Sequence, residues 1–273
     1  MNIKRIISLL LFAVLSLLVV LNAVSCAKSV YASDGKSRPG KGSGVSIYDE
    51  VSTEKNEPAV PTGKTIIVDP GHGFRDPGAG AEDYEMGPGI DESVVTLQVA
   101  LLLKQDLIDL GYNVIMSHEG VPTPEIQAYL EPENWFDPEE RAVYFNSLTA
   151  DCLVSLHCNM FPQDTSARGT RVYVQQFWDE SAYKYVPDPV SIVLADKIVE
   201  SYNSAGTGTK DAISDMSDLA VLRGRAYPAT LIEMGFISNP EDAKMLVDPE
   251  WQATFSKAVA AGIDNYLKEN SKS

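Results

Sequence analysis

The sequence predicts a single α/β domain in which a largely parallel sheet carries helices on both faces. Short apolar, β-branched runs alternate along the chain with longer segments of helical periodicity. The runs stop at Gly, Pro or Asp, which interrupt regular structure. After the amino-terminal region about 200 residues remain, a length that suits one domain with a sizeable core. Alternating strands and helices are typical of a parallel sheet covered on both sides.

The first 26 residues are expected to be a secretory signal and not part of the fold. Lys4 and Arg5 precede an uncharged apolar run, 6–20, which is followed by small residues. This is the composition of a signal peptide. The run is almost long enough to span a bilayer, so a retained membrane anchor is the alternative. We therefore expect an exported protein that works outside the membrane.

Two processing routes are open for this signal. The segment Ala23-Val24-Ser25-Cys26 is similar to a bacterial lipoprotein box, although the usual Leu three residues before the cysteine is missing. Lipidation of Cys26 would attach the protein to the outer face of the membrane. Cleavage after Ala27 or Ala32 by ordinary signal peptidase would instead release it. The sequence slightly favours the lipoprotein route.

Residues 27–63 are expected to be a flexible linker, which leaves 64–270 as the folded domain. The linker is rich in Ser, Gly, Lys, Pro and Glu and carries few apolar residues. Such a composition cannot bury enough surface to fold. The formal net charge of the chain is −16, so nucleic acid and anionic membrane surfaces are unlikely partners on electrostatic grounds.

The first half of the domain contains three expected strands and two expected helices. The Ile66–Val68 run is a buried strand by composition, and helix 93–110 starts after Asp91 and ends before Gly111. Asp137-Pro138 is a strong helix start. The intervening segment 119–136 is long for a connection and rich in Pro, Glu and aromatics, so we expect a lid or a substrate-facing insertion. The remaining expected elements are the strands 112–117 and 152–157 and a helix over 137–148.

The second half is expected to contain three strands and two helices. Strands are predicted at 169–176, 219–222 and 229–234. Helices are predicted at 189–203 and, after the cap Asp248-Pro249, up to about residue 268. Cys152 and Cys158 lie six residues apart in one expected strand, about 20 Å at the rise of a strand. That separation is too large for a disulfide between them.

Four chemically active side chains stand where these elements begin or end. His72, His157 and Glu233 each follow or end an expected strand, and Glu92 stands at the start of a helix. The carboxyl ends of parallel strands share one edge, where ligands usually bind. Gly71 and Gly73 add no bulk beside His72, so another group can approach its ring. We therefore expect the four side chains to converge.

Two imidazoles and one carboxylate are a usual ligand set for catalytic zinc, which keeps an open position for water. A second carboxylate, not bound to the metal, is then needed as general base. Glu92 and Glu233 are both available for these two roles, and their positions in the sequence do not decide between them.

Five segments together resemble one enzyme family. IVDPGHGFRDPGAG, DESVVTLQVALLL, VSLHCN, SARGTRVYV and ATLIEMGFISNPEDAKML occur in this order. They are similar to segments of the zinc-dependent N-acetylmuramoyl-L-alanine amidases of the LytC/AmiC type. The resemblance covers about residues 65–268 and implies a twisted, mixed sheet flanked by helices.

The resemblance also assigns roles. It implies one Zn²⁺ per chain, held by His72, Glu92 and His157, and Glu233 as the catalytic base. The implied substrate is bacterial peptidoglycan. The implied reaction hydrolyses the amide between the lactyl group of N-acetylmuramic acid and L-alanine of the stem peptide. The alternatives are a zinc peptidase that cuts within the stem peptide and a non-catalytic peptidoglycan-binding module.

Several other side chains have a functional and a structural interpretation. His118 could compete as a ligand, although a surface His is commoner and the ligand set is complete without it. Arg223 could meet a carboxylate of the stem peptide, or it could simply be solvated. The aromatic residues of segment 119–136 could stack on sugar, although burying the underside of their own segment is the commoner use; they are Tyr129, Trp135 and Phe136.

Overall fold

The computed structural model describes residues 60–73, 76–80, 90–135, 137–208, 213–214 and 219–270. The expected signal, 1–26, lies outside the described residues, as does the expected linker up to residue 59. Among the described helices, none has the length and apolar character needed to span a membrane.

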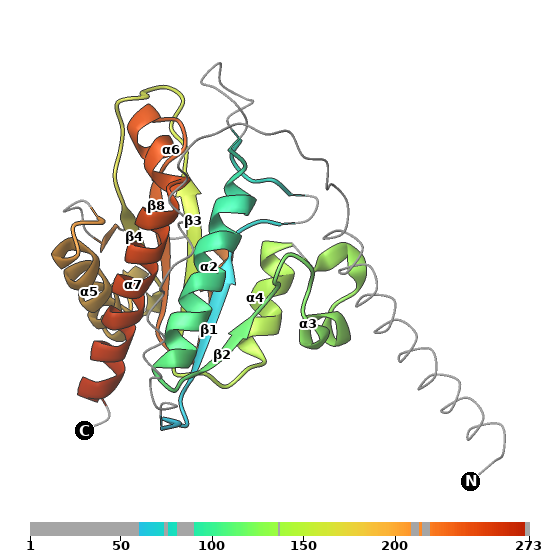
Figure 1. Cartoon of the computed structure of the whole chain (residues 1–273). Helices are drawn as coiled ribbons and strands as arrows, with labels where there is room; N and C mark the ends of the chain where they lie inside the picture. Colours follow the sequence, from blue (N-terminus) through green and yellow to red (C-terminus); the bar gives the residue numbers. More distant parts are fainter. Residues whose placement is uncertain are drawn as a thin grey trace, which may run out of the picture. The chain divides into compact units, whose positions relative to one another are not determined.

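The described part of the domain is built on a six-stranded mixed sheet with the order β2-β1-β3-β8-β4-β7 (Figure 1). Within the described part of this sheet, the pairs β1–β2, β1–β3, β3–β8 and β4–β7 are parallel, and the pair β4–β8 is antiparallel. This confirms the expected α/β class and the mostly parallel sheet. The strands are β1 (Thr65–Pro70), β2 (Asn113–Met116), β3 (Cys152–Asn159), β4 (Arg171–Val174), β7 (Ile213–Ser214) and β8 (Ala229–Phe236).

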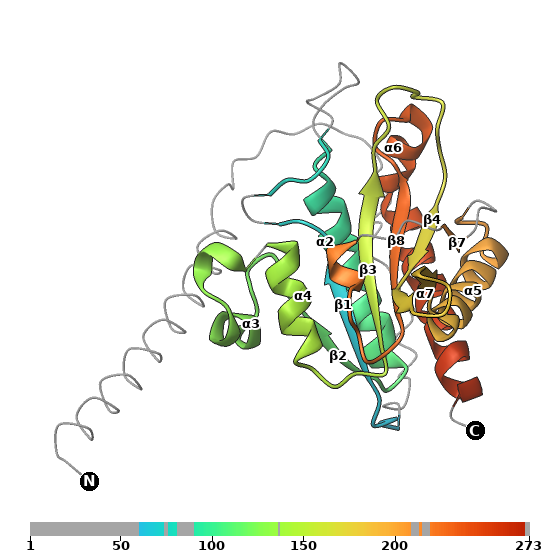
Figure 2. The ribbon, with the colours of Figure 1, turned by 180° about the vertical axis from the view of Figure 1, so that it is seen from behind.

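Helices cover both faces of this sheet. One face packs on α2 (Glu92–Asp109), α5 (Pro189–Ser204) and α7 (Pro249–Asn270). The opposite face, turned towards the reader in Figure 2, packs on α3 (Pro124–Tyr129), α4 (Pro138–Asn146) and the 3-10 turn η3 (Ala220–Leu222). Alternation along β1 divides the core, since Ile66 and Val68 face the first layer and Ile67 faces the second.

Helix starts follow the capping residues in the sequence. The side chain of Asp137 accepts hydrogen bonds from the backbone N–H groups of Glu139 and Glu140 at the start of α4. Asp188 caps α5 in the same way, through the N–H of Ser191. Asp91 occupies the N-cap of α2 as predicted, but its side chain makes no capping bond. Two further short helical elements complete the described structure, η2 (Pro132–Asn134) and α6 (Pro240–Leu246).

One prediction about the chain between these elements was wrong, and another is tested only in part. Residues 219–222 are not a strand but lead into η3, because Val221 and Leu222 pack on the sheet instead of pairing within it. The described part of segment 119–136 folds into α3 and η2 and buries Ile126 and Leu130 in the core, so it is anchored to the domain. That this segment is a lid or a substrate-facing insertion stays a prediction. The prediction that Cys152 and Cys158 form no disulfide is confirmed, since both are buried free thiols.

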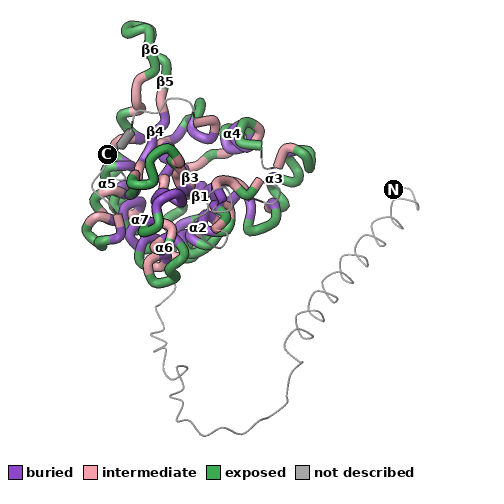
Figure 3. The backbone as a smooth tube through the Cα atoms, turned by 90° about the horizontal axis from the view of Figure 1, so that it is seen from above, coloured by how far each residue is buried: buried purple, intermediate pink, exposed green. Residues whose placement is uncertain are grey.

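A two-stranded antiparallel hairpin is present that the sequence did not predict. It consists of β5 (Gln176–Asp179) and β6 (Lys184–Pro187), which pair with each other and not with the main sheet. Figure 3 shows this hairpin standing out from the rest of the domain, with exposed and intermediate residues along it. The sequence predicted one strand over 169–176, whereas β4 ends at Val174 and β5 begins two residues later.

Candidate metal centre

His72 is held in an uncommon backbone conformation just after β1. Its φ is +61°, a left-handed value that side chains with a Cβ rarely adopt. Such strain persists only where the surroundings impose it, and it concentrates at functional sites. Here a short turn fixes the loop, with reciprocal backbone hydrogen bonds between Gly73 and Asp76. The carboxylate of Asp76 also accepts a hydrogen bond from Nδ1 of His72 at 2.7 Å, which leaves Nε2 facing the site.

Glu92, the first residue of α2, is 3% exposed and is held by backbone groups on two sides. Its Oε2 accepts from the N–H of Ala79 at 2.9 Å, and its Oε1 accepts from the N–H of Cys158 at 2.8 Å. These bonds fix the carboxylate between the His72 loop and β3.

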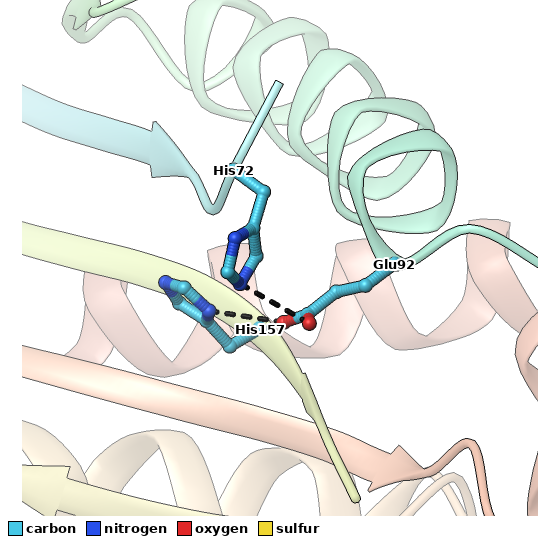
Figure 4. A group of neighbouring side chains, drawn as sticks. All are labelled: His72, Glu92 and His157. Carbon is cyan, nitrogen blue, oxygen red and sulfur yellow. Dashed lines mark hydrogen bonds and ion pairs between the residues drawn. The ribbon is translucent and has the colours of Figure 1, made fainter. Parts of the chain in front are cut away.

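The three expected ligands meet at this carboxylate (Figure 4). Nε2 of His72 lies 3.1 Å from Oε2 of Glu92, and Nδ1 of His157 lies 3.0 Å from Oε1. The two imidazole rings cross at 76° with centroids 4.9 Å apart. One donor atom from each residue lies within 4.8 Å of the other two, so the three can share one metal ion. The predicted convergence of His72, Glu92 and His157 is therefore present in the fold.

Two glycines make this approach of the rings possible. A Cβ at Gly71 would overlap the imidazole of His157. At Gly78, where φ is +70°, it would lie 2.6 Å from both Glu92 Oε2 and a ring carbon of His72. The prediction that another group could approach the ring of His72 is confirmed, since the ring of His157 lies 4.9 Å away and occupies the space that Gly71 leaves free.

Opposite charges are concentrated at the site. Burial alone would raise the pKa of Glu92, but hydrogen bonds and charge from His157 and His72 bring it well below its ordinary value. Burial would likewise lower the pKa of His72, but Glu92 and Asp76 raise it to about 9. The carboxylate is thus ionised at neutral pH and attracts cations.

Glu233 lies on β8, directly beside His157 in the parallel pairing of β3 with β8. Residues paired in this way point to the same face of a sheet. Its Oε2 is buried and makes no hydrogen bond with the described residues, although the residue as a whole keeps some exposure. Burial raises the pKa of Glu233 to about 7, with the nearby Glu92 adding to the rise and the imidazoles opposing it. An unpaired carboxylate that titrates near neutrality beside the ligands suits a general base.

Comparison with known proteins agrees with this geometry. Residues 66–265 match the N-acetylmuramoyl-L-alanine amidase family, Amidase_3. The chain belongs to this family. It is therefore an amide hydrolase by family, and the expected family membership is confirmed.

Three similar proteins illustrate the relationship to other amidases. An uncharacterised cell wall amidase of Bacillus anthracis is 30% identical over 76% of this chain, which spans 36% of that protein. A germination-specific N-acetylmuramoyl-L-alanine amidase of Bacillus subtilis is 28% identical over 76% of this chain and 81% of its own length. The solved CwlD amidase of Clostridioides difficile, in complex with the GerS lipoprotein, superposes with a TM-score of 0.62 at 25% identity, over 76% of this chain and 99% of that one.

The other polar candidates, His118 and Arg223, lie elsewhere in the amidase fold, and Cys158 beside His157 is not a ligand either. His118 is 2% exposed and its Nε2 lies 3.1 Å from the backbone oxygen of Pro70, so it lies below the His72 loop and outside the ligand group. Arg223 pairs with Glu139 on α4 at 2.8 Å. Cys158 packs into the core on the opposite face from His157, as alternation along a strand requires.

The aromatic residues of segment 119–136 mainly serve their own packing. Tyr129 contacts Tyr144, with ring centroids 5.4 Å apart, and Trp135 donates a hydrogen bond to the backbone oxygen of Leu130. Phe136 lies outside the described residues.

A buried ion pair beside the candidate metal centre was not predicted from the sequence. Asp69, at the end of β1, is fully buried and pairs with Arg141 of α4 at 2.9 Å. Ser117 and Ser155 donate hydrogen bonds to the same carboxylate. Burial would raise the pKa of Asp69, but Arg141 and the two hydroxyls lower it below its ordinary value. Arg141 also donates to the backbone oxygen of Pro70, so this group anchors the strand end that carries the His72 loop.

Proposed function

We propose that this amidase hydrolyses the amide between the lactyl group of N-acetylmuramic acid and L-alanine in peptidoglycan, with Glu233 as general base. The observation that carries the proposal is the placement of Glu233 beside His157, with a buried and unpaired Oε2. Few other roles explain an unpaired carboxylate in such a position, since a merely structural one would be paired.

The ligand residues fit a zinc ion. Two imidazoles and one carboxylate are a usual set for catalytic zinc, and the donor atoms of His72, Glu92 and His157 lie close enough to share one ion. Asp76 hydrogen-bonds the outer nitrogen of His72, which is the support that metal-binding histidines usually have. When bound, zinc would supply a Lewis acid that lowers the pKa of water and polarises the scissile carbonyl.

Glu233 would move the proton during hydrolysis. Its carboxylate accepts a proton from the water that attacks the carbonyl carbon of the amide. The same carboxyl group then donates this proton to the nitrogen of the leaving alanine. Both steps need a carboxyl group that changes charge near the working pH, and the pKa of Glu233 is about 7.

The expected export fits this substrate, because peptidoglycan lies outside the cytoplasmic membrane. We propose that residues 1–26 direct secretion, that residues 27–63 tether the domain, and that lipidation of Cys26 would hold it at the outer face of the membrane. Support comes from the amino-terminal sequence alone.

A digest of purified sacculi tests the proposal. Mass spectrometry should find intact stem peptides freed from the glycan, and a chelator should abolish their release until zinc is restored. E233Q should bind zinc as the wild type does yet lose most activity, roughly a hundredfold or more for a general base. Glu250→Gln, an exposed glutamate of α7, is the matched control and should remain active.

Three outcomes would contradict the proposal. Fragments of stem peptide in place of intact ones would show a zinc peptidase. No bound zinc and no gain of activity on adding it would indicate a binding module. Near-normal activity of E233Q would remove the general base from this position.

A further inference from the structure

The hairpin formed by β5 and β6 exposes an unusual number of aromatic side chains. Phe177 and Trp178 are each 45% exposed, Tyr185 is 59% exposed and Tyr183 is 83% exposed. The ring of Trp178 meets Tyr185 and Tyr183 edge to face, with centroids 5.3 and 5.9 Å apart. The rings therefore hold one another in place on the projecting hairpin (Figure 3). Exposed apolar clusters of this kind usually mark a binding surface.

A cavity of about 700 Å³ lies at the base of this hairpin. Phe177, Trp178 and Tyr185 line its hairpin side, and Leu222 and Arg223 line the side of η3. Cavities of this size, with mostly apolar walls and a few polar groups, are typical of ligand sites.

One polar atom at the cavity is left without a partner. Gln176 lines the cavity, and its Oε1 is buried without a hydrogen bond from the described residues. Leaving a buried acceptor unpaired is energetically unfavourable, because the atom has lost its hydrogen bonds to water. A ligand that donates an O–H or N–H group to this oxygen would remove that cost.

The cavity lies on the same sheet face as the catalytic residues. On β4, Arg171 is paired with Glu233, and Gln175, which directly follows β4 and lines the cavity, comes four residues later, about 13 Å along the chain and on the same face of the sheet. Leu231, two residues before Glu233 on β8, packs with Leu222 of the cavity wall. The cavity and Glu233 therefore lie on one face of the sheet at a separation that a polymeric substrate is long enough to span.

We propose that the hairpin cavity is a subsite for the glycan strand of the substrate. Neutral N-acetylated sugar rings would stack on Trp178 and Tyr185, with Gln176 accepting a hydrogen bond from a hydroxyl or acetamide N–H group. The inference rests on the proposed function, because it names which part of peptidoglycan this second site binds.

The charged groups at the cavity favour a neutral sugar over the stem peptide. A stem peptide ends in a carboxylate, which needs a cation. Arg223 is already paired with Glu139, and Arg225 is buried and donates to the backbone oxygens of Val221 and Ala142. The hairpin itself carries Asp179 and Glu180 beside a single lysine, so its charge does not attract acidic peptides.

Calorimetric titration with two separate probes tests this subsite. The probes are oligomers of N-acetylglucosamine, which supply neutral N-acetylated sugar rings without a peptide, and the free stem peptide. Zinc-loaded E233Q serves as the background, so that binding is measured without turnover. The glycan should bind, and Trp178→Ala should weaken its binding at least tenfold, whereas Trp178→Phe should keep most of the affinity.

Two further variants separate the subsite from a general loss of structure. Gln176→Leu removes the acceptor but leaves the rings, and should weaken glycan binding severalfold with an unchanged circular dichroism spectrum. Tyr129→Ala removes an aromatic ring of similar exposure on α3 and should leave glycan binding unchanged.

The results distinguish this subsite from the proposed reaction. Binding of the stem peptide in place of the glycan, or equal glycan affinity in Trp178→Ala, would overturn the subsite while the sacculus digest still reports amidase products. Glycan binding without amidase products would overturn the proposed reaction instead.

Discussion

Replacing Glu233 with Gln should stabilise the metal-free protein at pH 8 and change its stability little at pH 4. The ordinary pKa of a glutamate is 4.5, and in the fold the pKa of Glu233 is about 7. Burial is the main cause, His157 opposes it, and Glu92 adds to the rise. The folded protein therefore holds a proton on this carboxyl group over a pH range in which the unfolded chain has released it.

The sign of the effect follows from this difference in bound protons. Where the folded state binds more protons than the unfolded state, the free energy of unfolding decreases as pH rises. The stabilisation by the neutral carboxyl is complete below pH 4.5 and is lost as pH rises through about 7. The difference between the pKa values of 4.5 and about 7 corresponds to about 3 kcal/mol in the free energy of unfolding. E233Q has no proton to release, so it should exceed the wild type by up to that amount at pH 8.

Urea unfolding of chelator-treated protein at pH 4 and pH 8 measures this difference. Glu180→Gln is the control, since Glu180 is exposed in the hairpin turn and its replacement should change stability by less than about 0.5 kcal/mol. If E233Q were less stable than the wild type at pH 8, or if the difference were the same at both pH values, burial of an unpaired carboxylate would be the wrong description of this position.

Three further changes test the metal centre and its support. Gly71→Ala should lower zinc affinity at least tenfold, because its Cβ would overlap the imidazole of His157. Competition with a chelating dye measures this affinity. Gly80→Ala is the control and should bind zinc normally, since its Cβ would lie 3.6 Å from the nearest atom. Arg141→Met should lower the free energy of unfolding by about 3–5 kcal/mol, since it leaves Asp69 charged and buried; a loss below about 1 kcal/mol in chemical denaturation would show that the pair is not needed. Removing zinc should abolish activity but leave the far-ultraviolet circular dichroism spectrum unchanged, because the two core clusters do not include the ligands; unfolding on chelation would contradict this.

The sequence was sufficient to predict the central strands, the long helices and the convergence of His72, Glu92 and His157. Long periodic segments such as α2 and α7 have one interpretation each, and the carboxyl ends of parallel strands must share an edge. The position of His157 and Glu233 on adjacent strands followed from that rule, although only the pairing in the structure places them side by side. The choice of Glu233 over Glu92 as the base depended on family resemblance, and Glu92 is indeed the residue that contacts both imidazoles.

Short and long-range features were less predictable. Residues 219–222 form an apolar run of a length that suits either a strand or a buried turn, and tertiary packing selected the turn. The hairpin strands have four residues each, and their aromatic side chains resemble those of a buried strand although they remain exposed. The pairing of Asp69 with Arg141 joins residues 72 positions apart, and no local sequence pattern predicts such a contact.

The left-handed backbone of His72 sets stability against catalysis at one position. A residue with a Cβ in this conformation costs about 1 kcal/mol or more relative to glycine, so H72G should relax the loop while removing a zinc ligand. A library screened only for heat resistance should therefore enrich glycine at this position, whereas a screen for wall hydrolysis should retain histidine. The residue found at position 72 would therefore show whether a variant had been selected for stability or for activity.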